Sequence, residues 1–268
     1  MSAENDPSLN TKEKAPAAES GIEIGERTKQ LFGHCLEISR LEEGDRIPVG
    51  GTSIFSTKAD IEITGDFKYF EQFFTEVHEM SDKLKLPKIR EWLDEQELDI
   101  DEKLFATLFA FARKYEEKYP ANSERAAERR RVYHERDREI KLSTLFENNA
   151  AECAEIAALA QFYLQQEGIA STYFNGDVLW NKDWEFSEEH SFIIIRQGDK
   201  NYIYDPSNPL VGSDSGRWPS IYTTELNFDE EMAKRQKRFV TARDILSKKE
   251  AFFGTNNGTL VLAEEHVV

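Results

Sequence analysis

Two apolar runs joined by a tight turn constrain this 268-residue chain more than any other feature of its sequence. Residues 191–196 (SFIIIR) and 201–204 (NYIY) are rich in β-branched and aromatic side chains. The QGDK between them carries the Gly-Asp pair that hairpin turns prefer. The sequence therefore predicts an antiparallel hairpin in which Arg196 pairs with Asn201.

Two titratable residues bracket this hairpin. In the predicted register Phe192 faces Asp205, and His190, Phe192 and Asp205 share one side because side chains alternate between the faces of a strand. Asp205 then lies diagonally across from His190, about 5–8 Å away by typical cross-strand geometry. That separation allows a carboxylate–imidazole hydrogen bond. A strand-edge histidine and an Asp-Pro turn are common structural features, so the pair alone does not indicate chemistry.

A cysteine earlier in the chain, Cys153, supplies the nucleophile that the His190–Asp205 pair lacks. Residues 156–164 repeat apolar side chains at helical spacing, and Gly168 ends the segment. Asn149 followed by Glu152 resembles a capping box, so we expect the helix to begin there with Cys153 in its first turn. The positive end of the helix dipole favours a thiolate at that position. Cys153 also lies on the apolar stripe, where a cysteine can be a small core residue.

The order of these residues is typical of a nucleophilic site. With GIASTYFNG at 168–176 and YIYDPSNP at 202–209, the segment from Cys153 resembles the core of the transglutaminase-like branch of the papain-like thiol enzymes. The resemblance implies that Cys153 is the nucleophile, His190 the general base and acid, and Asp205 the group that orients His190. The spacings between the three residues are most similar to those of bacterial glutamine-deamidase toxins and effectors.

The resemblance leaves the oxyanion donors open. The backbone amide of Cys153 is one candidate, and the side chain of Asn148 or Asn149 is a second, although either asparagine also fits a helix cap. The sequence departs from the family at Ala154, where many members have an aromatic residue after the cysteine.

Two tryptophans flank the predicted site. Trp184 precedes His190 and Trp218 follows Asp205, in segments expected to be loops. Loops beside a site often carry binding residues, so either ring can wall a substrate groove, and either can equally pack in the core.

The expected reaction is acyl transfer. The thiolate of Cys153 attacks a carboxamide, His190 protonates the leaving ammonia or amine, and a second nucleophile releases the thioester. Water acting on a glutamine side chain gives a protein deamidase, which the spacing favours. An acceptor amine gives a transglutaminase, and attack on a peptide bond gives a thiol protease. A non-catalytic binding module of the same fold, with Cys153 in its core, is the alternative from another class.

Composition limits the partners and cofactors. A net charge of −17 opposes binding to nucleic acid and to anionic membranes. Two cysteines make no disulfide framework and favour a reducing compartment, the cytosol of the producing cell or of a host that receives an effector. The sequence contains no HExxH and no P-loop, so we expect no metal or nucleotide cofactor. No segment has the length and hydropathy of a membrane span. The expected partner is a glutamine-bearing protein.

The expected architecture is α+β. Residues 1–20 are polar and rich in Ala, Glu, Ser and Pro, which predicts a disordered tail. Residues 21–142 predict a mostly helical region, with an aromatic stripe over 66–118 that indicates a core. Residues 143–268 predict a papain-like core, in which a nucleophile helix packs on an antiparallel sheet.

Four further segments carry predictions. We expect a short helix over 23–39, a charged helix over 122–142, and a helix over 229–249. The cluster Arg129–Arg131 is assigned to the solvated face of the charged helix. Residues 252–262 predict two strands around an Asn-Gly turn.

Overall fold

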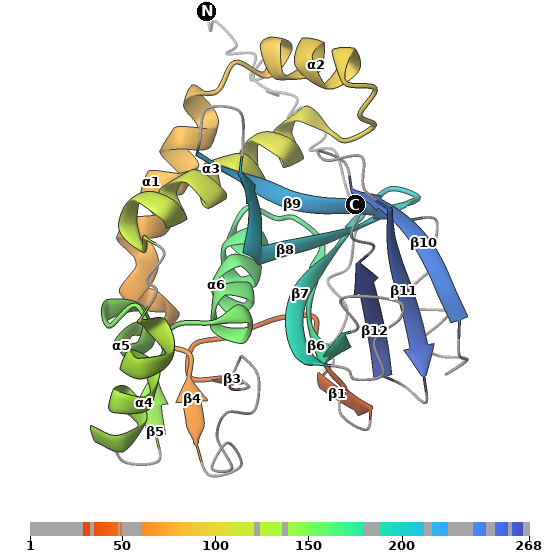
Figure 1. Cartoon of the computed structure of the whole chain (residues 1–268). Coiled ribbons are helices and arrows are strands. Elements are labelled where there is room, and N and C mark those ends of the chain that lie inside the picture. The colour runs from red at the N-terminus through yellow and green to blue at the C-terminus, as the bar shows by residue number, and fades with distance from the viewer. Residues whose placement is uncertain are drawn as a thin grey trace, which may run out of the picture.

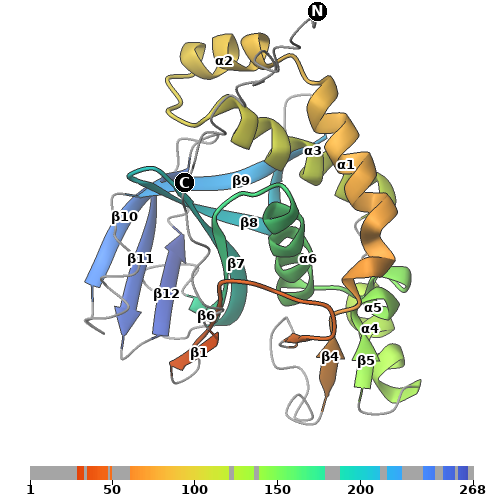
Figure 2. The same ribbon diagram turned by 180° about the vertical axis from the view of Figure 1, so that it is seen from behind.

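The computed structural model describes eleven stretches of the chain. They are residues 29–32, 35–47, 49, 61–120, 124–135, 139–178, 188–211, 216–224, 238–244, 250–256 and 259–264. Within them the chain is a mixed α+β protein, in which helices lie on one side of a large, curved antiparallel sheet (Figures 1 and 2). The expected tail at 1–20 lies outside the described residues.

Helices dominate the region between residues 67 and 166. After a 3-10 turn at Phe67–Phe70 come α1 (Glu71–Lys83), α2 (Leu86–Glu95), α3 (Glu102–Lys118), α4 (Arg125–Glu135), α5 (Leu142–Glu147) and α6 (Cys153–Gln166). The helices predicted over 66–118 are confirmed, and α3 is capped by the Asp101 carboxylate, which accepts from the Leu104 N–H at 2.8 Å. No helix in the described ranges is both long and apolar enough to cross a bilayer.

The large sheet has nine strands in the order β1-β2-β6-β7-β8-β9-β10-β11-β12. Its strands are β1 (Lys29–Phe32), β2 (Cys35–Ile38), β6 (Ser171–Val178), β7 (Glu188–Gln197), β8 (Lys200–Val211), β9 (Arg217–Thr224), β10 (Arg238–Asp244), β11 (Glu250–Asn256) and β12 (Thr259–Glu264). The far end curls back so that β12 contacts β6. Helix α6 lies between strands β6–β8 and the helices α1 and α3 (Figures 1 and 2).

A small second sheet lies beside α4 and α5 (Figure 1). It contains β3 (Arg46–Ile47), β4 (Glu62–Thr64) and β5 (Glu139–Lys141), with β4 and β5 parallel. Strand β5 explains why the charged helix ends earlier than predicted. Residues 139–141 pair with β4, so α4 ends at Glu135 rather than continuing to residue 142.

The hairpin predicted from the sequence is confirmed, register included. Arg196 pairs with Asn201 and Ile194 with Ile203 across β7 and β8. Gly198 takes a φ of 62° in the turn, a conformation that glycine adopts without steric cost. The two strands predicted over 252–262 are also confirmed, since β11 and β12 are antiparallel with Asn256 opposite Thr259. The predicted Asn-Gly turn at 257–258 lies outside the described residues.

Two predicted helices are strands instead. In the 23–39 segment β1 and β2 form a hairpin, and β2 pairs with β6 through Leu36 and Asn175. Within 229–249, residues 238–244 form β10 and pair with β11. Strand β2 pairs with a strand far along the chain, and β10 pairs with the strand that follows it. In both cases the hydrogen bonds to the partner strand outweigh the local helical pattern.

The predicted domain boundary at residue 142 runs through a shared core. Strand β2 extends the sheet that carries β7 and β8, and one hydrophobic cluster contains side chains from α1, α3, α6 and the sheet. The Gln165 side chain links the two regions directly. Its Oε1 accepts from the Leu41 N–H at 2.9 Å, and its Nε2 donates to the Leu41 carbonyl at 3.1 Å.

Candidate active site

Cys153 is the first residue of α6. The helix is capped by Glu152, whose side chain accepts from the Glu155 N–H, while the Glu155 carboxylate accepts from the Glu152 N–H at 2.9 Å. The predicted cap at Asn149 is wrong, because Asn149 adopts a φ of 51° and an N-cap requires extended backbone. The shift places Cys153 at the first helical position, where the unsatisfied amides and the helix dipole act most strongly.

His190 and Asp205 form the hydrogen bond that their register predicts. His190 Nε2 donates to Asp205 Oδ2 at 2.8 Å, and the two residues are only 5% and 4% exposed. Asp205 is held by the chain that follows it. Its Oδ1 accepts from the Ser207 N–H and hydroxyl at 3.0 and 2.7 Å, and its Oδ2 accepts from Asn208 Nδ2 at 3.0 Å. The carboxylate is therefore fixed in position and satisfied on both oxygens.

The electrostatics of the pair favour two charged groups. Burial by itself lowers the pKa of His190, but the charge and hydrogen bond of Asp205, with a hydrogen bond to Cys153, raise that pKa to about 10. Burial acts to raise the pKa of Asp205, whereas the charge of His190 and the hydrogen bonds from His190, Ser207 and Asn208 lower it. At neutral pH an imidazolium therefore lies between a carboxylate and the Cys153 side chain, whose thiol is in no disulfide.

A buried arginine holds the segment that carries the cysteine. Arg129, on α4, is 1% exposed. Its Nη1 donates to the Ala150 carbonyl at 2.7 Å and its Nη2 to Glu155 Oε1 at 2.9 Å. Its Nε lies 3.8 Å from the Glu152 carboxylate. One guanidinium thus balances the two capping carboxylates and ties the loop before Cys153 to the first turn of α6.

The predicted solvated face holds for two of the three clustered arginines. Arg130 and Arg131 are exposed, but Arg129 is in the core. A signal was present in the sequence. Glu155 is the single charged residue between Cys153 and Gln166, in the largely apolar first half of the helix, and a buried carboxylate requires a cationic partner.

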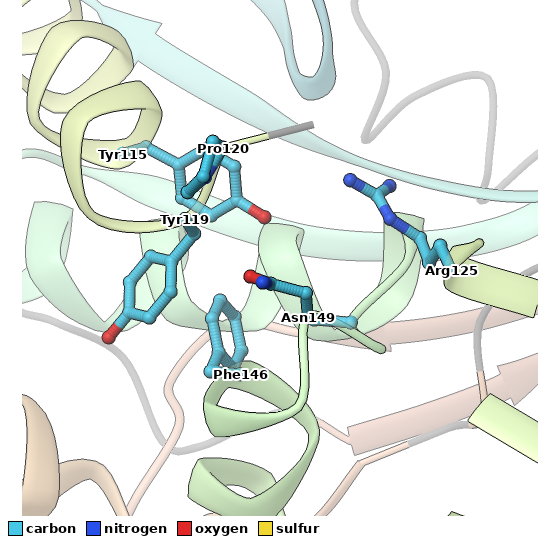
Figure 3. A pocket seen from close by; sticks show the side chains of 7 residues that line it. Tyr115, Tyr119, Pro120, Arg125, Phe146 and Asn149 are labelled. Carbon is cyan, nitrogen blue, oxygen red and sulfur yellow. The ribbon is translucent and has the colours of Figure 1, made fainter. Parts of the chain in front are cut away.

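The two asparagines proposed as oxyanion donors are used differently. Asn148 Nδ2 donates to the Thr144 carbonyl at 2.7 Å, and its Oδ1 accepts from Arg131 at 2.7 Å. Asn148 therefore closes the end of α5, and this engagement removes it from the oxyanion candidates. The Asn149 side chain lines a hollow beside the loop instead (Figure 3).

Trp218 packs against helices. It lies on β9 opposite Leu210, and its ring is 5.3 Å from Trp92, 6.3 Å from Phe105 and 5.1 Å from Phe109, measured between centroids. The ring joins α2 and α3 to the sheet, so the structure gives it a packing role rather than that of a groove wall. Trp184 lies outside the described residues.

Comparisons with protein-family models, with curated proteins and with solved structures gave no match. Within the described stretches, no three His, Cys, Asp or Glu side chains gather as a metal site would require.

Proposed function

We propose that this chain is a cysteine-dependent acyl-transfer enzyme with a papain-like, transglutaminase-like core, and that it deamidates glutamine side chains of a protein substrate. The observation that carries the proposal is the buried hydrogen-bonded series Asp205–His190–Cys153, with Cys153 at the start of a helix. A nucleophile, a base and a group that orients the base are the three parts that such catalysis needs.

Each member has a defined part in the reaction. His190 uses Nε2 for Asp205, which leaves Nδ1 for proton exchange with the Cys153 sulfur. The thiolate attacks the carboxamide carbon, the C–N bond breaks, and the imidazolium gives its proton to the departing ammonia. The neutral imidazole then takes a proton from water. The resulting hydroxide attacks the thioester, which releases a glutamate side chain and regenerates the thiolate.

The start of α6 supplies positive potential for the oxyanion. Backbone amides in a first helical turn point toward the developing negative charge. The capping carboxylates of Glu152 and Glu155 oppose that charge, and Arg129 offsets them. We therefore assign Arg129 a positioning and balancing role behind the nucleophile.

The reaction requires a reduced thiol, and we place the activity in a reducing cytosol, including that of a host if the chain is a secreted effector. The spacings between Cys153, His190 and Asp205 favour deamidation, in which water is the second nucleophile, over transglutamination. Attack on a peptide bond would instead require a groove for extended backbone on both sides of Cys153.

The experiment compares wild type with Cys153→Ala on a host-cell lysate and on unstructured glutamine-containing peptides. Wild type should release ammonia and raise the mass of target glutamines by about 1 Da, and the variant should do neither. Amine-linked products would instead indicate a transglutaminase, and cleaved peptides a protease. If Cys153→Ala retains the full effect, the fold is a binding module and the proposal is wrong.

A further inference from the structure

The pairing of β8 with β9 is interrupted directly after Asp205. The two strands pair regularly up to Asp205, and pairing resumes only at Leu210. Residues 206–209 (PSNP) of β8 therefore lie opposite a single residue of β9, Pro219. Such a bulge bends a strand and re-aims its side chains, and bulges are common next to active sites.

Three prolines explain the interruption. Pro206 and Pro209 on β8 and Pro219 on β9 have no backbone N–H to donate to the ladder. Proline inside a sheet is found at edges and bulges for this reason. The sequence itself thus excludes regular pairing here, and Ser207 and Asn208, between the two prolines of β8, are free to make other contacts.

Both of these residues turn back to the Asp205 carboxylate. The N–H and the hydroxyl of Ser207 donate to Oδ1, which is the turn that an aspartate forms with the backbone two residues on. Asn208 Nδ2 donates to Oδ2 at 3.0 Å, and the same oxygen accepts from His190 Nε2 at 2.8 Å. The bulge therefore supplies three of the four donors around this carboxylate, and His190 supplies the fourth.

The four donors favour one protonation state of the pair. A proton on Asp205 would place an O–H against the Ser207 N–H or the Asn208 amide NH₂, and two donors cannot bond to each other. The proton between His190 and Asp205 is therefore held on Nε2 of the imidazole. When His190 is neutral during turnover, its Nδ1 is then the unprotonated nitrogen, on the side available to Cys153.

Asn208 differs from the pair in its exposure. Asp205 and His190 are buried, whereas Asn208 is exposed, and among the described residues its side chain bonds to Asp205 alone. Core packing does not require it, so substitution separates its effect on the carboxylate from folding. Two other titratable groups act within this cluster. Cys153 contacts His190 from α6, and Tyr204 stays neutral because burial and the Asp205 charge raise its pKa.

We propose that Asn208 is a positioning residue of the active site, which together with Ser207 holds Asp205 as a fixed acceptor and so keeps the proton of the pair on His190 Nε2. Asn208 acts through Asp205 and not on the nucleophile. Its effect on turnover rests on the proposed acyl-transfer function, whereas its effect on the His190–Asp205 pair is measurable without a substrate.

The first measurement follows the low-field proton resonance of the His190 Nε2–H during acid titration, assigned by its loss in His190→Ala. The hydrogen bond from Asn208 lowers the pKa of Asp205, so in Asn208→Ala the acid midpoint of this resonance should move to higher pH. Asn208→Asp adds a like charge beside Oδ2 and should move the midpoint further. Ser207→Ala retains the backbone donor to Oδ1 and should move it least. Equal midpoints in wild type and both Asn208 variants would overturn the proposal.

The second measurement is ammonia release. Asn208→Ala should lower kcat by about three- to tenfold, the effect of one hydrogen bond, and leave KM within about twofold. The matched control is Asn201→Ala, at the opposite end of β8, which should keep the wild-type kcat and acid midpoint.

Urea unfolding of the same proteins separates positioning from folding. Asn208→Ala should unfold at the wild-type urea concentration, because the side chain is exposed. An unchanged kcat in Asn208→Ala, or a loss of kcat that comes with an equal loss of folded protein, would overturn the positioning role. A moved acid midpoint in a chain whose wild type releases no ammonia would contradict the proposed function and keep the assignment of Asn208.

Discussion

Two histidines of this chain each contact a carboxylate at about hydrogen-bond distance, in opposite surroundings. His190 is buried on β7 with Asp205 at 2.8 Å. His78 lies on the surface of α1, with its side chain 52% exposed, between Glu167 at 3.1 Å and Asp82 at 3.3 Å. By their nitrogen–oxygen distances alone, the two sites are similar.

The difference between the two sites shows which surroundings allow a histidine–carboxylate pair to activate a nucleophile. Both ring nitrogens of His78 face carboxylates, so that ring has no nucleophile to activate. One nitrogen of His190 is fixed by Asp205, and the ring also contacts Cys153. Water around His78 screens its ion pairs, whereas burial strengthens the electrostatic interaction at His190.

The largest expected effect is the difference in catalytic activity between variants of the two histidines. His190→Ala removes the proposed general base and acid and should lower kcat/KM by about 10²–10⁴-fold. His78→Ala should change it by less than about twofold, because exposed ion pairs contribute little. Ammonia release from a glutamine-containing substrate measures both. Equal losses in the two variants would show that burial and the Cys153 contact do not distinguish the sites.

The same contrast between buried and exposed charge should appear in stability at α4. Arg129→Met leaves Glu155 buried without its cation and should lower the unfolding free energy by about 3–5 kcal/mol. Arg130→Met, on the exposed face, should change it by less than about 0.5 kcal/mol. Urea unfolding measures both values.

A double variant tests whether the Arg129 effect comes from the unpaired carboxylate. Adding Glu155→Gln to Arg129→Met removes the buried charge and should recover part of the loss. A double variant that is less stable than Arg129→Met alone would assign the effect to lost packing instead.

The features that the sequence predicts correctly depend on residues close together in the chain. The hairpin register follows from strand alternation and from the turn at Gly198, and it brings His190 and Asp205 together without knowledge of other elements. The apolar spacing after Cys153 predicts its place in a first helical turn. The cap predicted at Asn149 is wrong, because the left-handed conformation of Asn149 depends on how the loop crosses from α5 to α6.

The parts that were missed depend on contacts between distant segments. Strand β2 forms because β6 offers it an edge, and nothing in the 23–39 segment indicates that partner. Arg129 is buried because Glu155 and the Ala150 carbonyl face it from another helix and its loop. The hollow that the Asn149 side chain lines likewise lies where α3, α4, α5 and the loop before Cys153 meet.

A smaller effect is expected in the pH dependence of the buried pair. The raised pKa of His190 adds stability that is fully present below pH 6.5 and lost as the pH rises through about 10. The lowered pKa of Asp205 adds stability that is present above pH 3.8 and lost as the pH falls through its folded value. The penalty of Asp205→Asn should therefore be greatest between pH 3.8 and 6.5, at about 2–3 kcal/mol.

Glu167→Gln, at the carboxylate that contacts the exposed His78, provides the control for that measurement. It removes one carboxylate from His78 and should cost less than about 1 kcal/mol at every pH tested. Unfolding free energies of the three proteins at a series of pH values give the comparison. A penalty for Asp205→Asn that grows above pH 10 would have the wrong sign for a charged His190–Asp205 pair.

The smallest effect should come from the cysteine itself. Cys153 is 8% exposed and small, and alanine at the first position of α6 preserves the helix, so Cys153→Ala should lower the unfolding free energy by about 1 kcal/mol or less. Its activity should nevertheless be lost, because no other side chain replaces the thiolate. Thermal melting and ammonia release on one preparation measure both. A loss above about 3 kcal/mol would place Cys153 among the core residues whose removal leaves a cavity, and the contrast between the two histidines would then reflect packing rather than chemistry.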